Sequence, residues 1–206
     1  MPPTTTFKDH AKSYADWSVV SPFNRDYDRP TILHLAGDLN GKRVLELGCA
    51  SGVLTTHLIE RGADVLSVDI EPQMIELARQ RLGSKARFEI VDLDHPPSLG
   101  PASSIDVVVA SLVLHYLADW GPLLQELHRF LKHGGALIFS LHHPITDWAL
   151  SDRDDYHRVE LVSQAWDLGG VATTITSYRR PLSSIFGELR RAGFAIDVVE
   201  DGSRGS

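Results

Sequence analysis

A short glycine turn between an apolar segment and a helix is the feature that most constrains this chain. The turn, Gly48-Cys49-Ala50-Ser51-Gly52, follows an apolar strand expected over 43–47, and a second apolar strand ends on Asp69. This order of strand, glycine turn, helix and acid is typical of nucleotide-binding βαβ units. Glycine lets the backbone approach a ligand closely, and the acid can accept hydrogen bonds from ribose hydroxyls. The sequence therefore predicts a nucleotide-type site at this turn.

The residues at fixed positions of the turn argue against a dinucleotide. A dinucleotide fingerprint has the form Gly-x-Gly-x-x-Gly, but this chain has Ala50 and Val53 at the second and third glycine positions. In addition, Glu46 would repel a pyrophosphate just before the turn. An acid there suits a cationic group instead, such as an ammonium or a sulfonium. The turn therefore favours a positively charged ligand.

Strand-like and helix-like segments alternate along the rest of the chain. The strands are expected at 43–47, 64–68, 87–91, 105–110, 136–141 and 194–199. The helices between and after them are expected at 53–61, 72–82, 120–131 and 182–192, with two earlier helices at about 7–20 and 27–38. Such alternation predicts an α/β fold with a doubly wound, mostly parallel, Rossmann-like sheet and an N-terminal helical cap.

The length of 206 residues fits a single α/β domain with its own hydrophobic core. We divide it into the helical cap (7–40), a cofactor-binding core (43–142), an insertion or lid (144–180) and a last helix and strand (181–200). The final residues, 202–206, are expected to form a flexible tail. Because an insertion after the carboxyl end of a strand lies over the ligand crevice, residues 144–180 are the candidate substrate lid.

Composition narrows the class of partner. The formal net charge is −7, so no basic surface for nucleic acid is expected. One cysteine excludes an internal disulfide and fits a reducing compartment. No run approaches the roughly 20 apolar residues that span a bilayer, and the start has no signal-peptide pattern. We expect a cytoplasmic protein that acts on a small molecule, with no membrane partner, as a monomer or homodimer.

Taken in order, these motifs resemble those of the class I S-adenosylmethionine-dependent methyltransferases, in particular the small-molecule, ubiquinone-biosynthesis-like group (methyltransferase type 11). The resemblance covers about 24–200 and departs at Ala50, where that family often has glycine. It implies one methyltransferase domain over 1–206, with S-adenosyl-L-methionine as cofactor and S-adenosyl-L-homocysteine as product. The implied reaction is methyl transfer to a small-molecule acceptor by in-line displacement at the sulfonium methyl.

The resemblance also implies roles for individual residues. Asp69 would hold the ribose hydroxyls, Ile70 and Met74 would pack against adenine, and the backbone near Ser111 would contact the methionine end. The residues expected to bind the cofactor are Tyr14, Tyr27, Glu46, Gly48, Cys49, Ala50, Gly52, Asp69, Ile70, Met74, Asp92, Leu93 and Ser111. These positions come from well-separated motifs, so the prediction requires the fold to bring them together.

Three histidines at strand ends are the candidate catalytic residues. The cofactor carries the reactivity, and a base is required only where the acceptor must lose a proton. His115 follows the fourth strand and is either such a base or a packing residue, while His142 and His143 follow the fifth. Neighbouring residues on a strand face opposite sides, so at most one of that pair should face the crevice. No metal site is expected, because no carboxylate or cysteine stands beside the pair at ligand spacing.

The end of the chain departs from the family pattern. The family's sheet usually finishes with an antiparallel hairpin, but few residues follow 194–199. The last antiparallel strand is therefore expected to be missing, or replaced by the β-like run at 171–176. A missing strand would leave an edge that favours dimerisation.

Two alternative functions stay open at this point. One is a NAD-dependent oxidoreductase, which the third position of the turn disfavours. The other is a regulatory or scaffolding protein of the methyltransferase fold that binds the cofactor without turnover.

Overall fold

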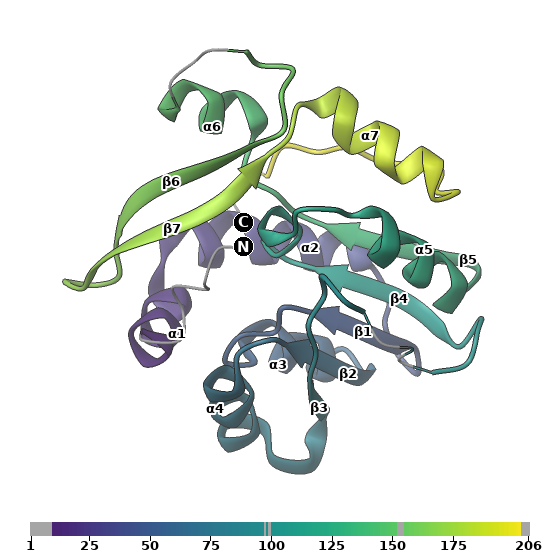
Figure 1. Cartoon of the computed structure of the whole chain (residues 1–206). Coiled ribbons are helices and arrows are strands. Elements are labelled where there is room, and N and C mark those ends of the chain that lie inside the picture. Colours follow the sequence, from purple (N-terminus) through teal and green to yellow (C-terminus); the bar gives the residue numbers. More distant parts are fainter. Residues whose placement is uncertain (1–9, 97, 99, 152–154, 203–206) are drawn as a thin grey trace.

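The computed structural model describes residues 10–96, 98, 100–151 and 155–202, and its central feature is a five-stranded parallel sheet (Figure 1). The strand order is β3-β2-β1-β4-β5. The strands are β1 (Arg43–Leu47), β2 (Asp64–Asp69), β3 (Arg87–Ile90), β4 (Ile105–Ala110) and β5 (Leu131–Phe139). The order reverses between β1 and β4, so the crevice beyond their carboxyl ends is the topological switch point where ligands bind in such sheets. The predicted doubly wound α/β fold is confirmed.

Helices cover both faces of this sheet. They are α1 (Ala11–Val20), α2 (Arg29–Ala36), α3 (Val53–Glu60), α4 (Pro72–Leu82), α5 (Gly121–Phe130), α6 (Pro144–Leu150) and α7 (Leu182–Arg191). A π-helical turn η1 (Phe23–Asp28) joins α1 to α2, and two 3-10 turns are η2 (Gly83–Lys85) and η3 (Leu114–Tyr116). Residues 7–9 of the expected first helix and 203–206 of the expected tail lie outside the described residues.

The central strand β4 shows why the sheet needs cover on both sides. Val108 and Ala110 pack with α5 and α7, whereas Val107 and Val109 pack with α2 and α3. All four are nearly inaccessible to water. Successive side chains of a strand point to opposite faces, so a continuous apolar run is the pattern of a strand buried on both faces. The core therefore lies in two layers, one on each side of the sheet.

The insertion forms a separate unit above the carboxyl ends of the strands. It contains α6 and an antiparallel hairpin of β6 (Glu160–Asp167) and β7 (Ala172–Arg179). The hairpin is a sheet of its own and lies over the crevice, beside α6 (Figure 1). The run 171–176 belongs largely to β7 and pairs with β6, so it does not replace a strand of the main sheet.

The expected strand at 194–199 is wrong. Among the described residues, this segment pairs with no strand, and Ile196, Val198 and Val199 are 40%, 55% and 68% exposed. A strand exists only where its backbone groups have a partner edge, and the described sheet ends at β5. The expectation that the last antiparallel strand is missing agrees with this five-stranded sheet.

The fifth strand also differs from the prediction. It begins at Leu131 rather than at Ala136, because Leu131 pairs with Ile105 ahead of a register shift in β4. Gly134 and Gly135, which follow the helix expected at 120–131, lie within β5. Helix α5 itself ends at Phe130, where Leu131 already has an extended backbone. Glycine weakens both helices and strands, so local sequence did not distinguish these two boundaries.

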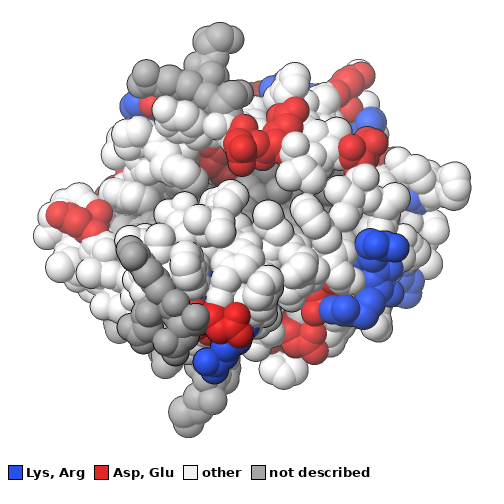
Figure 2. All heavy atoms as spheres, turned by 90° about the horizontal axis from the view of Figure 1, so that it is seen from above, with Lys and Arg blue, Asp and Glu red and all other residues white. Residues whose placement is uncertain are grey.

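The surface seen from above in Figure 2 is mainly uncharged, with a compact group of Lys and Arg side chains at one edge and scattered acidic groups. Across the part of the chain that the structure describes, no helix combines the length and the apolar character that crossing a bilayer requires.

The two-layer core leads to a stability prediction. Leu127 in α5 is completely buried, whereas Leu150 in α6 is 66% exposed. We expect Leu127→Ala to lower the free energy of unfolding by about 2–5 kcal/mol, because it removes buried methyl groups and leaves a cavity. The matched change Leu150→Ala should alter it by less than about 0.5 kcal/mol. Urea unfolding measures both, and equal losses would contradict the assignment of α5 to the core.

Candidate functional site

The turn after β1 has the backbone geometry of a ligand cradle. The φ angles of Gly48, Ala50 and Gly52 are +67°, +46° and +76°. A Cβ added at Gly48 would lie 2.5 Å from Val113 Cγ2, so only glycine fits there. The amide of Cys49 donates to the carbonyl of Val68 at 3.0 Å, which attaches the turn to β2. Ala50 adopts a left-handed conformation that costs about 1–2 kcal/mol, a cost that glycine would avoid.

Asp69, at the end of β2, supports the same turn. Its carboxylate accepts from the amide of Ala50 at 2.8 Å and from the amide of Glu71 at 2.9 Å. Burial raises the pKa of Asp69 in spite of these hydrogen bonds. A carboxylate offers about four acceptor positions, and the backbone amides do not fill all of them, so acceptor capacity remains for a ligand. Asp69 can therefore hold the turn and accept hydrogen bonds from ribose hydroxyls at the same time.

Glu46 lies below the turn in a buried polar group. One of its carboxylate oxygens accepts from the hydroxyls of Thr55 at 2.5 Å and Ser67 at 2.6 Å. The side chain is almost inaccessible to water, and this burial raises its pKa to about 7. Glu46 is thus poised between its neutral and ionised forms near neutral pH, and a cation above the turn would favour the ionised form.

A cleft of about 480 Å³ lies above the turn. Six of the thirteen residues predicted to bind the cofactor line it: Tyr14, Glu46, Gly48, Cys49, Ala50 and Ser111. They come from α1, β1, the turn and the residue after β4. The fold therefore brings together residues that are far apart in the sequence.

The other seven predicted residues do not line this cleft: Tyr27, Gly52, Asp69, Ile70, Met74, Asp92 and Leu93. Asp69 contacts it indirectly through Ala50, and Gly52 shapes the turn. Met74 is buried beneath α1, against Ala11 and Ala15.

Of three more of these seven residues, two are exposed and one is buried. Ile70 and Asp92 lie exposed at the ends of their strands, and the Asp92 carboxylate lies 3.0 Å from a His95 ring nitrogen. Leu93 belongs to the hydrophobic core rather than to an open surface. Their roles toward the cofactor stay predictions.

Two charged residues that sequence reasoning missed also line the cleft. Asp28 ends η1, and its carboxylate accepts from the Ser111 hydroxyl at 2.5 Å. Burial raises the pKa of Asp28. Arg29 begins α2 and donates to the carbonyl of Ser18 at 3.0 Å. The only signal in the sequence is an adjacent acid and base between two helices, which is equally typical of a solvated helix start.

Acidic groups determine the electrostatics of the cleft. Asp28 and Glu46 line it, and Asp69 holds the turn at its edge. Burial, together with the charges of Asp69 and Asp28, raises the pKa of Tyr14 to about 12. Among the described residues that line the cleft, Arg29 is the one with a cationic side chain. The cleft therefore attracts a ligand that carries positive charge and also offers one donor for a carboxylate.

The three candidate histidines have different surroundings. His115 is buried in η3, neither ring nitrogen has a hydrogen-bond partner, and its ring stacks on His142 with centroids 4.5 Å apart. Burial, with the neighbouring His142 and Arg180, lowers the pKa of His115 well below its usual value, so the ring is neutral. His143 is exposed and accepts from the amide of Ile145 at 3.2 Å, which caps α6.

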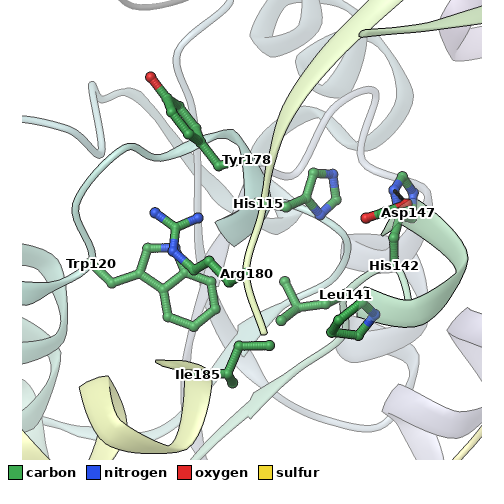
Figure 3. Close-up of a pocket in the computed structure, with 9 residues that line it drawn as sticks. His115, Trp120, Leu141, His142, Asp147, Tyr178, Arg180 and Ile185 are labelled. Carbon is green, nitrogen blue, oxygen red and sulfur yellow. Dashed lines mark ion pairs between the residues drawn. The ribbon is translucent and has the colours of Figure 1, made fainter. Parts of the chain in front are cut away.

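His142 faces the interior, as expected for one member of the pair. It lines a second pocket of about 230 Å³, and its Nδ1 lies 3.8 Å from Oδ1 of Asp147 (Figure 3). In the described part of the chain, no three His, Cys, Asp or Glu side chains gather where they could hold a metal ion.

Aromatic rings connect the two pockets. Tyr14 in the first cleft lies 5.9 Å from Trp17, which lies 5.3 Å from Trp166 of the hairpin. Trp166 in turn lies 6.0 Å from His142 of the second pocket. The insertion therefore covers the crevice by packing against both α1 and the end of β5.

Comparison with known proteins agrees with this geometry. Residues 45–139 match the family described as Methyltransferase domain. The chain is 30% identical over 199 residues to an uncharacterized protein from Haemophilus influenzae, covering 86% of this chain and 77% of that one. It is 39% identical over 124 residues to a magnesium-protoporphyrin O-methyltransferase from Rhodobacter capsulatus, covering 57% and 53%. A structure of a S-adenosylmethionine dependent methyltransferase from Mesorhizobium loti shares the fold, with a TM-score of 0.68 and 24% identity over 89% and 85% of the chains.

The chain belongs to the class I S-adenosylmethionine-dependent methyltransferases. S-adenosylmethionine is therefore the cofactor of this methyltransferase, and the oxidoreductase alternative is wrong. The methyltransferase spans about half the length of the Rhodobacter relative, so that enzyme's acceptor is not transferred to it.

The close approach at Gly48 leads to a second prediction. Gly48→Ala should displace Val113 and distort the turn, because the new Cβ would lie 2.5 Å from its Cγ2. Gly41→Ala is a matched control, since Gly41 has a similar φ of +70° but no atom within 4 Å of the added Cβ. We expect both variants to lose about 1–3 kcal/mol of stability from backbone strain. Calorimetry should show that only Gly48→Ala also weakens S-adenosylhomocysteine binding. Equal binding by both variants would contradict the cradle.

The raised pKa of Glu46 leads to a third prediction. Its pKa rises from 4.5 to about 7 on folding, so the folded protein holds this proton more tightly than the unfolded chain. The stability that protonation contributes is complete below pH 4.5 and is lost as the pH rises to about 7, by about 3 kcal/mol. Glu46→Gln keeps the accepting oxygen but cannot ionise, so it should remove this loss.

The measurement is urea unfolding of wild type and Glu46→Gln at pH 4.5 and pH 7.5. The stability difference between the two proteins should change by about 3 kcal/mol in favour of the variant over this range. Glu89→Gln, on the exposed side of β3, is the control and should track the wild type. A pH-independent difference for Glu46→Gln would show that its ionisation is not coupled to folding.

Proposed function

We propose that this methyltransferase binds S-adenosylmethionine in the cleft above the glycine turn and methylates a small-molecule acceptor under the insertion. The observation that carries the proposal is the convergence of Tyr14, Glu46, the turn and Ser111 on one cleft. The cleft lies at the switch point of the sheet, where such folds bind ligands.

The chemistry of the lining residues fits this cofactor. The positive φ angles of the turn let backbone atoms approach a ligand, and Asp69 retains acceptor positions for ribose hydroxyls. Asp28 and Glu46 suit an ammonium or a sulfonium, while Arg29 suits the carboxylate of an amino acid. The buried hydroxyl of Ser51, which has no hydrogen-bond partner, also lines the cleft and would gain one.

When bound, S-adenosylmethionine supplies an electrophilic methyl group that an in-line nucleophile accepts. The protein's own contribution is alignment and the exclusion of water. Trp17 and Trp166 close the crevice from above, and His115 and His142 line the side where the acceptor enters. If the acceptor must lose a proton, neutral His115 has a free ring nitrogen to receive it. The relative named as a magnesium-protoporphyrin O-methyltransferase supports a small-molecule acceptor.

The cofactor assignment leads to a fourth prediction. In calorimetric titration, the wild type should bind S-adenosylhomocysteine with micromolar affinity, and Asp69→Ala should weaken this at least tenfold, or about 1.4 kcal/mol. The control is Asp64→Ala, because Asp64 begins the same strand, β2, at the opposite and exposed end. Thermal melting of each variant separates lost binding from unfolding. Unchanged affinity in a folded Asp69→Ala variant would refute the role of Asp69.

Turnover requires a separate test, because a regulatory or scaffolding protein of this fold would also bind the cofactor. Release of S-adenosylhomocysteine from S-adenosylmethionine in the presence of an acceptor would eliminate that alternative. A cytoplasmic location and a monomeric or homodimeric state stay predictions.

A further inference from the structure

A buried arginine with an unused donor lines the second pocket. Arg180 follows β7, is only 5% exposed, and places its guanidinium over Trp120, with Cζ 4.8 Å from the ring centroid (Figure 3). Tyr178 lies on another side, 5.6 Å away. His115 and His142 line the same pocket. The guanidinium is therefore positioned by aromatic rings rather than by an acid.

The hydrogen bonds of Arg180 leave one nitrogen unsatisfied. Its Nη2 donates to the carbonyls of Leu117 and Ala118, both at 2.6 Å. Its Nη1 is buried and has no partner. Within the described residues, no carboxylate lies within 4.0 Å of this side chain. Leaving a buried charged donor unpaired costs free energy that an anionic ligand would recover.

The neighbouring Arg179 shows what a purely structural arginine looks like here. Its Nε donates to the carboxylate of Glu160 at 2.8 Å. Its two terminal nitrogens donate to the carbonyls of Asp155, Tyr156 and Arg158. Every nitrogen of Arg179 therefore has a partner inside the protein. Arg180 differs because its Nη1 is buried without a partner and its side chain lines a pocket.

The charges around the pocket leave one positive charge without a nearby opposite charge. Asp147 lies beside His142 rather than beside Arg180, with its Oδ1 3.8 Å from Nδ1 of His142. Burial keeps His115 neutral. Burial also lowers the pKa of Arg180 to about 10, so the guanidinium remains charged at neutral pH. Glu188, Asp119 and Asp94 act on Arg180 only through the longer-range field. A negative group beside Nη1 would give the guanidinium the close acceptor that the protein itself does not supply.

We propose that the methyl acceptor is a small carboxylic acid and that Nη1 of Arg180 recognises its carboxylate in this pocket. The inference rests on the proposed function, since it identifies the acceptor of the same site. A singly charged group fits better than a phosphate, because Asp147 lines the pocket and would repel a second charge. Trp120, Leu141 and Ile185 provide an apolar wall for the carbon skeleton.

The position of the pocket agrees with an acceptor that reaches the cofactor. His142 lines the pocket and also interacts electrostatically with Asp28, which lines the cofactor cleft. The pocket is small, so it would take only the acid end of a molecule. The rest of the acceptor would then extend toward the cofactor cleft. Arg180 is accordingly a specificity residue and not a catalytic one.

The first experiment compares acids with their uncharged analogues. Protein saturated with S-adenosylhomocysteine is titrated in a calorimeter with benzoate and hexanoate, then with benzamide, hexanamide and phenyl phosphate. We expect at least one acid to bind at least tenfold more tightly than its amide and more tightly than phenyl phosphate. Equal binding of acids and amides, or no binding of either acid, would overturn the proposal. Tighter binding of phenyl phosphate would also overturn it.

Substitutions then test Arg180 itself. Arg180→Met should abolish the preference for the acid, and Arg180→Lys should retain part of it. Because Arg180 also donates to two carbonyls, a second pair leaves it intact: Tyr178→Glu and Tyr178→Gln. Tyr178→Glu places a carboxylate beside the guanidinium and should bind acids at least tenfold more weakly than Tyr178→Gln, which removes the same ring without adding a charge. Equal acid binding by the two Tyr178 variants would overturn the proposal.

The affinity for S-adenosylhomocysteine distinguishes a failure of the proposed function from a failure of the carboxylate assignment. All four variants should bind it within about twofold of the wild type, because none of them lines the cofactor cleft. If the wild type fails to bind S-adenosylhomocysteine, the proposed function fails. If it binds the cofactor product but shows no preference for the acids, only the carboxylate assignment fails.

Discussion

Two hydrogen bonds from backbone amides to the carboxylate of Asp69 hold the candidate site together. One comes from Ala50 in the glycine turn and the other from Glu71 at the start of α4. The bond from Ala50 connects the ends of β1 and β2, beside the point where the strand order reverses between β1 and β4, and it supports the left-handed backbone of Ala50. The buried group of Glu46, Thr55 and Ser67 lies below the same turn and joins β1, α3 and β2. These hydrogen bonds to Asp69 and Glu46 together fix the shape of the cleft above the turn.

Much of the central fold could be predicted from the sequence because local signals mark its boundaries. Strands β1 and β4 and helix α4 have the predicted bounds, since Gly48, Pro72 and Gly83 punctuate the chain there. The same signals failed at β5, where Gly134 and Gly135 lie inside the strand. They failed again at 194–199, where an apolar run has no edge to pair with. A strand depends on its neighbour, and a single sequence does not show the neighbour.

The residues of the candidate site likewise divide into those that the sequence predicts and those that it does not. Glu46, Gly48 and Ser111 could be predicted because they belong to motifs at strand ends, where topology alone places them. Asp28 could not, because its role depends on how η1 docks against Ser111, far along the chain. Arg180 could not be distinguished from Arg179 in sequence, although one is saturated by internal partners and the other is not. The number of hydrogen-bond partners that a side chain has is known only from the tertiary structure.

The contact between Trp17 and Trp166 limits how strongly a closed crevice is favoured. It joins helix α1 to the hairpin across the crevice, with ring centroids 5.3 Å apart. An aromatic pair of this kind contributes about 0.5–1.5 kcal/mol beyond the area that it buries. Loss of this contact would therefore change the equilibrium constant between a closed and an open crevice by at most about tenfold. The contact therefore favours a closed crevice only weakly, so exchange of cofactor and product past it would break no strong interaction.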